Sequence, residues 1–431
     1  MSRIRLVGGT ITKTTGGDHN IYSEGNIVYN SGQAVTETSD TGIKYGDPKD
    51  APVKEVNEAV KEIELITKLD QGSANDKTGT FQDGMIFGKT YHFKVKSYVK
   101  DSPKNKLNIK WILRYHSLAD NSWKEISLSQ KGESLKITMN EEDMCGRFIY
   151  IRAYVKDHKT EAELKVWKHN RFRWFDRMQV EEEIKDRTDN NQPWKIDQAG
   201  TSLCGMACIF YLFAKEQPAQ YKKFAKELFR TGISSVNNFT VKPDTEILEK
   251  MVNKSGFPMK TSNMPAVDYI TMASTRNTDN PKYKGGDEEF QAINWPPLMT
   301  KLSEKFLGYK DVYSKGIYNP VKPLAYTTFD IQKKIDDINE QFNAGYKLIL
   351  MIDSDLISDV WDVSALDLHW VVLESPITWN YIPGFFTPKQ DEIDFKVYTW
   401  GTNPNGASRY LKKAISSSHF MNNYNGYIKC K

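Results

Sequence analysis

The chain has 431 residues, of which 39% are hydrophobic and 12% aromatic. This length exceeds one compact domain and the composition supports packed cores, so we expect two or three folded domains. The 59 Lys and Arg residues nearly balance the 55 Asp and Glu residues, which leaves a net charge of +4. That charge gives no basic footprint for nucleic acid, and the longest apolar runs are far shorter than the roughly 20 residues of a membrane-spanning helix. We expect no nucleic-acid partner and no membrane span.

The first residues predict no secretory signal peptide, because they contain neither a continuous apolar core nor a small-residue cleavage site. We therefore expect the protein to be made in the cytoplasm and to use no signal-peptide route. The seven histidines form no HxxxH pair, and the cysteines form no CxxC pair and no disulfide framework. We expect no metal and no cofactor. The four cysteines are Cys145, Cys204, Cys208 and Cys430.

Residues 1–48 form a leader rich in Gly, Ser, Thr and Asn. Short β-favouring pieces at residues 4–7, 26–29 and 34–36 alternate with Gly and Ser turns, which favours short strands over helices. Such a segment buries little surface alone. It is either a flexible leader or a small β unit that completes its core by stacking on another structure, and we favour the second interpretation.

Residues 49–175 are predicted to form an immunoglobulin-like, antiparallel β-sandwich. Alternating apolar and polar residues recur in short runs separated by turn residues, as strands with one buried face require. Trp111 is the expected core aromatic of a central strand, and Cys145 is expected to be a small core residue before the next strand. The predicted strands cover residues 62–67, 91–96, 107–112, 135–138, 148–154 and 163–167.

Residues 176–431 are predicted to form an α+β domain, with helices first and a sheet afterwards. The polar residues 274–294 are expected to be a surface loop. Residues 327–330 form a capping sequence and Gly345 ends the helix that they open. We expect helices at residues 202–216, 218–230, 244–255, 296–306 and 328–344, and strands at 347–352, 369–374 and 395–400.

The stretch from Gln198 to Ala207 is the most informative for chemistry. Apolar residues at 203, 206, 207, 210 and 214 mark one helix face, with Thr201 or Ser202 as the expected cap and Cys204 in the first turn. The positive end of the helix dipole and the unpaired N–H groups favour a thiolate, so we expect a lowered pKa for the Cys204 thiol. The alternative role for a cysteine on this apolar helix is that of a small buried hydrophobic residue, and we assign that role to Cys208.

Gln198 and His369 supply the other groups that a thiol nucleophile needs. The backbone N–H of Cys204 and the side-chain amide of Gln198 are candidate oxyanion donors. His369 opens an apolar strand of the same predicted domain and is the best-placed base. The other six histidines lie in the leader, in or near the sandwich, or in the polar tail, where structural roles fit them better.

These residues resemble the papain-like cysteine peptidases, particularly their compact bacterial-toxin branches. The resemblance rests on Gln-x5-Cys-Gly entering a helix, a later His-Trp-Val-Val strand and a following strand ending in Trp400 and Gly401. It covers residues 180–431 and implies that Gln198 is an oxyanion donor, Cys204 the nucleophile and His369 its base. The family's third residue, an Asn or Asp, has no clean counterpart. Thr399 is closest by register, with Asn403 and Asp394 as alternatives, and Trp370 and Trp400 are expected to shield the imidazole or fill the core.

A second resemblance concerns the leader, whose residues 4–11, 16–22 and 25–27 are similar to the amino-terminal segment of type VI secretion cargo effectors of Bacteroidetes-type bacteria. In those proteins a Gly-rich β leader and an immunoglobulin-like module precede a variable toxin domain. The resemblance implies delivery into a recipient cell without a signal peptide. It also implies a spike or tube protein of the secretion machine and an immunity protein as partners.

The sequence therefore predicts a secreted effector toxin with a papain-like thiol hydrolase domain acting on an amide bond. Peptide hydrolysis is the first choice, while glutamine deamidation of a target protein or peptidoglycan amidohydrolysis would use the same residues. The alternative is a structural or adaptor protein of the secretion spike whose last domain is a catalytically dead scaffold. The missing Asn or Asp favours that alternative.

Overall fold

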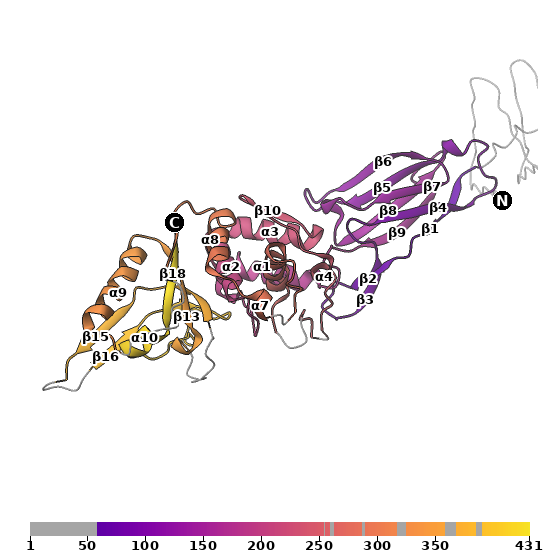
Figure 1. Ribbon diagram of the computed structural model, residues 1–431. Coiled ribbons are helices and arrows are strands. Elements are labelled where there is room, and N and C mark those ends of the chain that lie inside the picture. The colour runs from indigo at the N-terminus through magenta and orange to yellow at the C-terminus, as the bar shows by residue number, and fades with distance from the viewer. Residues whose placement is uncertain are drawn as a thin grey trace, which may run out of the picture.

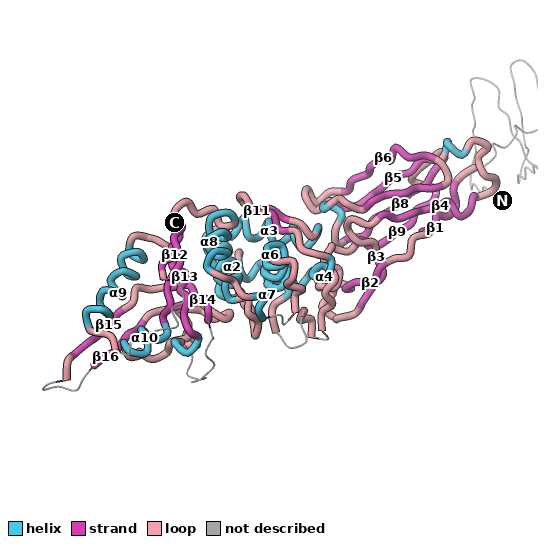
Figure 2. Tube along the Cα trace, in the orientation of Figure 1, coloured by secondary structure: helices cyan, strands magenta, loops and turns pink. Residues whose placement is uncertain are grey.

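A computed structural model of the chain describes residues 58–253, 255–258, 263–286, 289–316, 325–357, 368–384 and 390–431. The molecule is elongated: a β region is followed by a helical region and then by a mixed region that contains the C-terminus (Figure 1). Strands dominate both ends, and helices are concentrated in the middle (Figure 2). The predicted leader, residues 1–48, lies outside the described residues.

The first region consists of two antiparallel sheets packed against one core. Their strand orders are β1-β4-β7 and β6-β5-β8-β9. Trp111 lies on the interior strand β5 and is 1% exposed, as predicted, and its indole N–H donates to the Gly132 carbonyl at 2.9 Å. The strands are β1 (Val60–Leu65), β4 (Thr90–Tyr98), β5 (Lys110–His116), β6 (Trp123–Lys131), β7 (Ser134–Thr138), β8 (Arg147–Tyr154) and β9 (Ala162–Lys168), beside a hairpin of β2 (Asp70–Ser73) and β3 (Phe81–Gly84).

The helical region is built around α2, whose residues 204–214 are all buried. A helix that is apolar on every side belongs in the interior of a core, and neighbouring helices and a strand of the last region pack against it. The elements are α1 (Arg177–Arg187), α2 (Cys204–Glu216), α3 (Pro218–Thr231), α4 (Thr245–Leu248), α5 (Ala266–Asp268), the π-helix Tyr269–Ala273, α6 (Ser274–Asp279), α7 (Glu289–Ala292) and α8 (Pro296–Lys305), with a hairpin of β10 (Ser234–Val236) and β11 (Phe239–Val241).

The prediction of a surface loop at residues 274–294 is wrong for much of this segment. Helix α6 continues directly from the π-helix, and its first four residues are buried despite being polar. Backbone carbonyls accept hydrogen bonds from two of these side chains: the Thr275 hydroxyl donates to the Thr271 carbonyl, and Arg276 donates to the carbonyls of Ala292 and Ile293. The polar composition of this segment was therefore not evidence that it is exposed to solvent.

The last region contains a five-stranded sheet with the order β12-β18-β13-β14-β17. Alternate residues of β13 and β14 face opposite sides: Met351 and Trp370 join the core around α2, whereas Leu350 and Val371 join a second core with α9 and α10. The elements are β12 (Val312–Lys315), α9 (Thr328–Asn343), β13 (Lys347–Asp353), β14 (Leu368–Leu373), β15 (Thr378–Ile382), β16 (Gln390–Asp394), β17 (Val397–Tyr398), α10 (Ser417–Asn423) and β18 (Tyr424–Cys430).

The boundaries of several predicted elements are corrected. Helix α9 begins at the predicted capping box of Thr327 and Asp330, and Gly345 follows it with φ +86. The helix expected at 244–255 is only the short α4, and the strand expected at 395–400 is only β17. The strand ends early because Trp400 (φ +41) and Gly401 (φ +63) turn the chain in the left-handed region.

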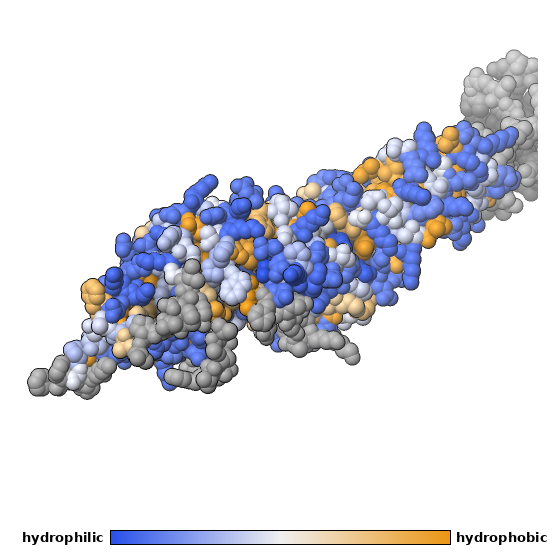
Figure 3. All heavy atoms as spheres, viewed as in Figure 1, coloured by the Kyte–Doolittle hydropathy of each residue, from blue (hydrophilic) through white to orange (hydrophobic). Residues whose placement is uncertain are grey.

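The described residues include no membrane-spanning helix and no metal-binding cluster, and their surface in the view of Figure 3 is largely polar. No helix there is long and apolar enough to cross a membrane. No group of three or more His, Cys, Asp and Glu side chains there could hold a metal ion. On the face drawn in Figure 3, hydrophilic residues cover most of the described surface, and apolar residues are scattered in small patches.

Candidate active site

Cys204 lies in the first turn of α2, as the sequence predicts, but the helix begins at Cys204 and not at residue 202, and its cap differs. Leu203 occupies the N-cap position and makes no side-chain cap hydrogen bond, so neither Thr201 nor Ser202 caps the helix. The hydroxyl of Thr201 instead donates to the Gln198 carbonyl at 2.8 Å. Because no side chain takes the first N–H groups of the helix, the N–H groups of Cys204 and Gly205 act on the Cys204 sulfur and favour its charged form.

The strand that carries His369 packs directly on α2. The backbone N–H of Trp370, the residue that follows His369, favours the charged form of the Cys204 thiol and so opposes the rise of its pKa. Strand β17 pairs only with Val372 and Leu373, so the first half of β14 has no β17 partner on that side. The turn after β17, which holds Thr399, is therefore free to approach His369.

The imidazole of His369 is held by two contacts from that turn. Its Nε2 lies 2.6 Å from the Thr399 hydroxyl oxygen, and its ring stacks on Trp400 with centroids 4.1 Å apart and planes 16° from parallel. Thr399 is the residue that the register argument placed closest. When Nε2–H donates to Thr399, the lone pair of Nδ1 is left to accept a proton. Trp400 covers one face of the ring, in keeping with the predicted shielding role.

The other two candidates for the third residue are engaged elsewhere. The Asn403 side chain accepts the backbone N–H of Asn405 at 3.0 Å, which is a local turn contact. Asp394 pairs with Arg409, with the closest N–O distance at 3.4 Å. Of the three candidates, Thr399 is the one that the structure brings to the imidazole.

Gln198 lies in the loop that leads into α2 and is 4% exposed. Its amide nitrogen donates to the Thr201 carbonyl at 2.7 Å. A primary amide has two N–H donors, so one remains for an oxyanion. The structure therefore holds Gln198 in a fixed orientation within the Gln-x5-Cys loop.

Burial controls the ionisation of both reactive groups. Cys204 is 7% exposed and His369 is 5% exposed. Burial raises the pKa of the Cys204 thiol to about 11, although the N–H groups of Trp370, Gly205 and Cys204 oppose the shift. Burial also lowers the pKa of His369 to about 3. The expected lowering of the thiol pKa is thus wrong for this conformation: desolvation outweighs the helix terminus, and the resting pair is a neutral thiol and a neutral imidazole.

A set of buried residues that the sequence reasoning missed holds the loop before Cys204. Asp268 and Arg187 form a fully buried ion pair with an N–O distance of 2.6 Å. Burial raises the pKa of Asp268, while the guanidinium opposes that shift. The same carboxylate accepts the backbone N–H of Asp197, whose own carboxylate accepts the N–H of Ala199. These contacts together connect α1 and α5 to the backbone around Gln198.

The turn that carries Thr399 is joined to the same loop. Tyr398 stacks on Tyr211 of α2 with centroids 3.7 Å apart, and its hydroxyl donates to the Ile196 carbonyl at 2.5 Å. Gly401 lies so close to Asp197 that a Cβ at Gly401 would meet that side chain at 3.0 Å. The sequence offers a weak signal for these contacts, since two aromatic residues flank Thr399 and a glycine follows them in the Tyr-Thr-Trp-Gly run.

Comparisons with known proteins add no relative: no family model matches the chain, and no curated protein and no solved structure matches it. The assignment of a function therefore rests on the residues and their geometry.

Proposed function

We propose that this protein is a thiol hydrolase that cleaves an amide bond with Cys204 as nucleophile and His369 as base. The observation that carries the proposal is the packing of α2, which begins at Cys204, against β14, which carries His369. Thr399 and Trp400 then fix the imidazole, and α2 presents its first N–H groups at the sulfur. These are the parts of a nucleophile, a base and an orienting group.

In the proposed reaction, Nδ1 of His369 accepts the proton of the Cys204 thiol as the sulfur attacks the amide carbon. A carbon–sulfur bond forms, and the Cys204 N–H and the free N–H of the Gln198 amide stabilise the oxyanion. The imidazolium then protonates the leaving nitrogen, which departs as an amine or as ammonia and leaves a thioester. Water, deprotonated by His369, hydrolyses the thioester and restores the thiol.

The same residues support a papain-like fold for residues 176–431, with the Cys helix in a helical layer and the His strand in the facing sheet. The two packed antiparallel sheets of the first region support an immunoglobulin-like module in front of it. Together they fit an effector delivered to a recipient cell, with peptide hydrolysis as the first choice of reaction. Glutamine deamidation and peptidoglycan amidohydrolysis are the other reactions of this thiol chemistry.

A Cys204→Ala substitution tests the proposal. We expect it to abolish toxicity in a recipient cell and to abolish release of amine or ammonia from a protein or peptidoglycan preparation. Cys208→Ala is the matched control, because Cys208 is one turn further along the same buried helix and has no role in the reaction. Circular dichroism and the melting temperature verify that both variants fold. Full activity in folded Cys204→Ala protein would refute the assignment.

A non-catalytic adaptor of the secretion spike is the second candidate, and one observation favours it. Both reactive side chains are buried and neutral, so an amide substrate reaches them only after they become exposed. An adaptor with a dead scaffold would keep its biological effect in the Cys204→Ala variant. The same experiment therefore separates the two functions.

A further inference from the structure

Cys145 and Lys168 form a buried pair outside the candidate active site. Cys145 ends the short 3-10 helix Glu142–Met144, and Lys168 is the last residue of β9. The sulfur and the lysine Nζ are 3.5 Å apart, and the two residues are 1% and 0% exposed. A lysine is rarely buried to this extent without a carboxylate partner.

Burial of the Lys168 amine shifts its ionisation toward the neutral form. Nζ of Lys168 donates to the backbone carbonyl of Glu141 at 2.6 Å and lies 5.1 Å from the centre of the Phe87 ring. Within the described part of the chain no carboxylate lies within ion-pair distance of this amine. Burial accordingly lowers the pKa of Lys168. A neutral amine keeps the lone pair that bond formation requires.

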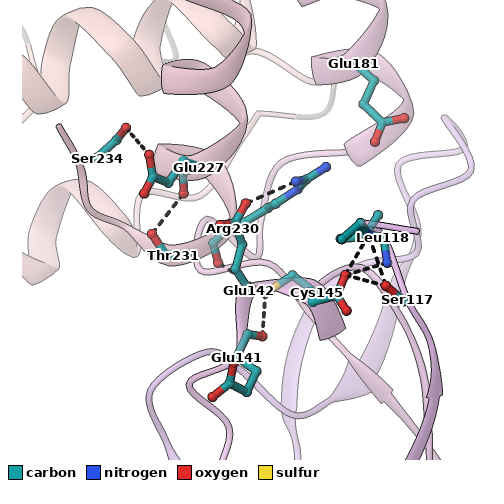
Figure 4. Close-up of polar contacts among 12 residues, drawn as sticks. Ser117, Leu118, Glu141, Glu142, Cys145, Glu181, Glu227, Arg230, Thr231 and Ser234 are labelled. Atoms are coloured by element: carbon teal, nitrogen blue, oxygen red, sulfur yellow. Dashed lines mark hydrogen bonds and ion pairs between the residues drawn. The ribbon is translucent and has the colours of Figure 1, made fainter. Parts of the chain in front are cut away.

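The sulfur of Cys145 sits where the two regions of the molecule meet. It lies 3.8 Å from the Glu141 carbonyl oxygen and 3.5 Å from the carbonyl oxygen of Arg230, near the end of α3. Figure 4 shows Cys145 between the Glu141 and Glu142 segment and Arg230. The guanidinium of Arg230 also pairs with Glu142 at 3.1 Å. Both neighbours of the sulfur other than Lys168 are carbonyl oxygens, so the amine is the reactive group within its reach.

We propose that Cys145 and Lys168 are an oxidation-sensitive pair that peroxide joins through a single oxygen atom as an N–O–S bridge. In the first step the thiol reduces one hydrogen peroxide to water and becomes a sulfenic acid. In the second step the amine and the sulfenic acid react with another hydrogen peroxide, the N–O bond forms, an N–H and an O–H bond break, and two waters leave. Sulfur and nitrogen each lose two electrons, and the two peroxides accept all four. The bridge closes a loop of 23 residues under the end of α3.

The other three cysteines provide an internal comparison. The Cys204 thiol lies at the start of α2, and the Cys430 sulfur contacts the Lys347 carbonyl at 3.6 Å. Cys208 is buried in the helix core. In the described chain none of these three has a lysine amine within hydrogen-bond distance of its sulfur. The bridge is therefore specific to Cys145.

Peptide mapping of the full-length protein after treatment with hydrogen peroxide tests the proposal. Trypsin does not cut after a modified lysine, so we expect residues 137–147 joined to an uncut peptide of residues 166–171. The joined species should be heavier than the two peptides together by about 14 Da, one oxygen more and two hydrogens fewer. A phosphine or thiol reductant should release both peptides.

Three variants sharpen the result. Cys145→Ser and Lys168→Arg should lose the joined peptide, whereas Cys430→Ser, which removes another buried cysteine, should keep it. The wild-type map decides the matter even if a variant fails to fold. Oxidation of Cys145 to the sulfinic or sulfonic acid with normal cleavage after Lys168 would overturn the proposal. So would an unmodified pair at a peroxide dose that oxidises Cys430.

Discussion

The ionisation of Cys204 gives the sharpest prediction from the geometry. The pKa of this thiol is raised by burial from 9.0 to about 11. At pH 7 an ordinary thiol is about 1% thiolate, and a thiol with a pKa of about 11 is about 0.01% thiolate. The thiolate fraction is therefore lower by about 100-fold, which corresponds to about 3 kcal/mol against ionisation. Alkylation of Cys204 in the folded protein should be slower by at least that factor.

The assay is the rate of iodoacetamide labelling between pH 6 and pH 9.5, followed by mass spectrometry. Trypsin releases residues 196–215 as one peptide that contains both Cys204 and Cys208, so the Cys208→Ala variant gives an unambiguous signal. The folded protein should show a rate that rises about tenfold per pH unit without levelling off. The same peptide labelled in urea should level off near pH 9.

The shape of the pH profile separates ionisation from steric access. Restricted access lowers the rate equally at every pH, whereas a raised pKa moves the point at which the rate levels off. Rapid labelling of folded protein at pH 6, or levelling near neutral pH, would refute the conclusion that burial outweighs the helix terminus. It would instead show that Cys204 and His369 rest as a thiolate and an imidazolium.

Three further predictions concern residues around and outside the site. Thr399→Val keeps the side-chain shape but leaves the His369 Nε2 without its hydrogen-bond partner. Loss of this hydrogen bond should raise the activation free energy by about 1–3 kcal/mol. Steady-state kinetics should then show kcat lower by about 10- to 100-fold with little change in KM. Asp268→Asn leaves the buried Arg187 charge uncompensated and should lower the free energy of unfolding by about 3–5 kcal/mol in urea titrations. Burial lowers the pKa of His169 to about 4, so the unfolded state binds more protons than the folded state between pH 6.5 and pH 4. The free energy of unfolding should therefore fall by about 1.4 kcal/mol per pH unit as the pH falls from 6.5. In the His169→Gln variant the urea midpoint should depend less on pH in this range.

The sequence predicted the elements that carry long periodic patterns. The helix expected at 202–216 corresponds to α2, and the strand expected at 369–374 corresponds to β14, because each has an apolar pattern set by its own buried face. The turn after β17 was missed. Its course depends on the left-handed conformation of Trp400, which is unusual for a residue with a Cβ and leaves no periodic signal.

Periodic patterns in the sequence did not predict contacts between polar residues that lie far apart in the chain. The pairing of Lys168 with Cys145 joins positions 23 residues apart, and a lysine in an alternating strand predicts a solvent-facing side chain. Arg187 and Asp268 are 81 residues apart; Arg187 ends a strongly charged helix, whereas Asp268 lies in a largely apolar segment. Only the packed structure shows that these charges lie in the core, where each is satisfied by a specific partner.

The sequence correctly placed Cys204 in the first turn of a helix and His369 in a strand but gave the wrong direction for the thiol pKa, and the reason bears on how the proposed site would work. A helix terminus lowers a thiol pKa when the sulfur keeps part of its hydration, whereas the Cys204 sulfur is almost fully desolvated. Thr399 offers His369 a neutral hydroxyl in place of a carboxylate, so no negative charge stabilises an imidazolium. Both features favour the neutral pair, and rehydration of the site would move both pKa values toward each other. Under the proposed function, exposure of the site would therefore raise the reactivity of the Cys204 thiol.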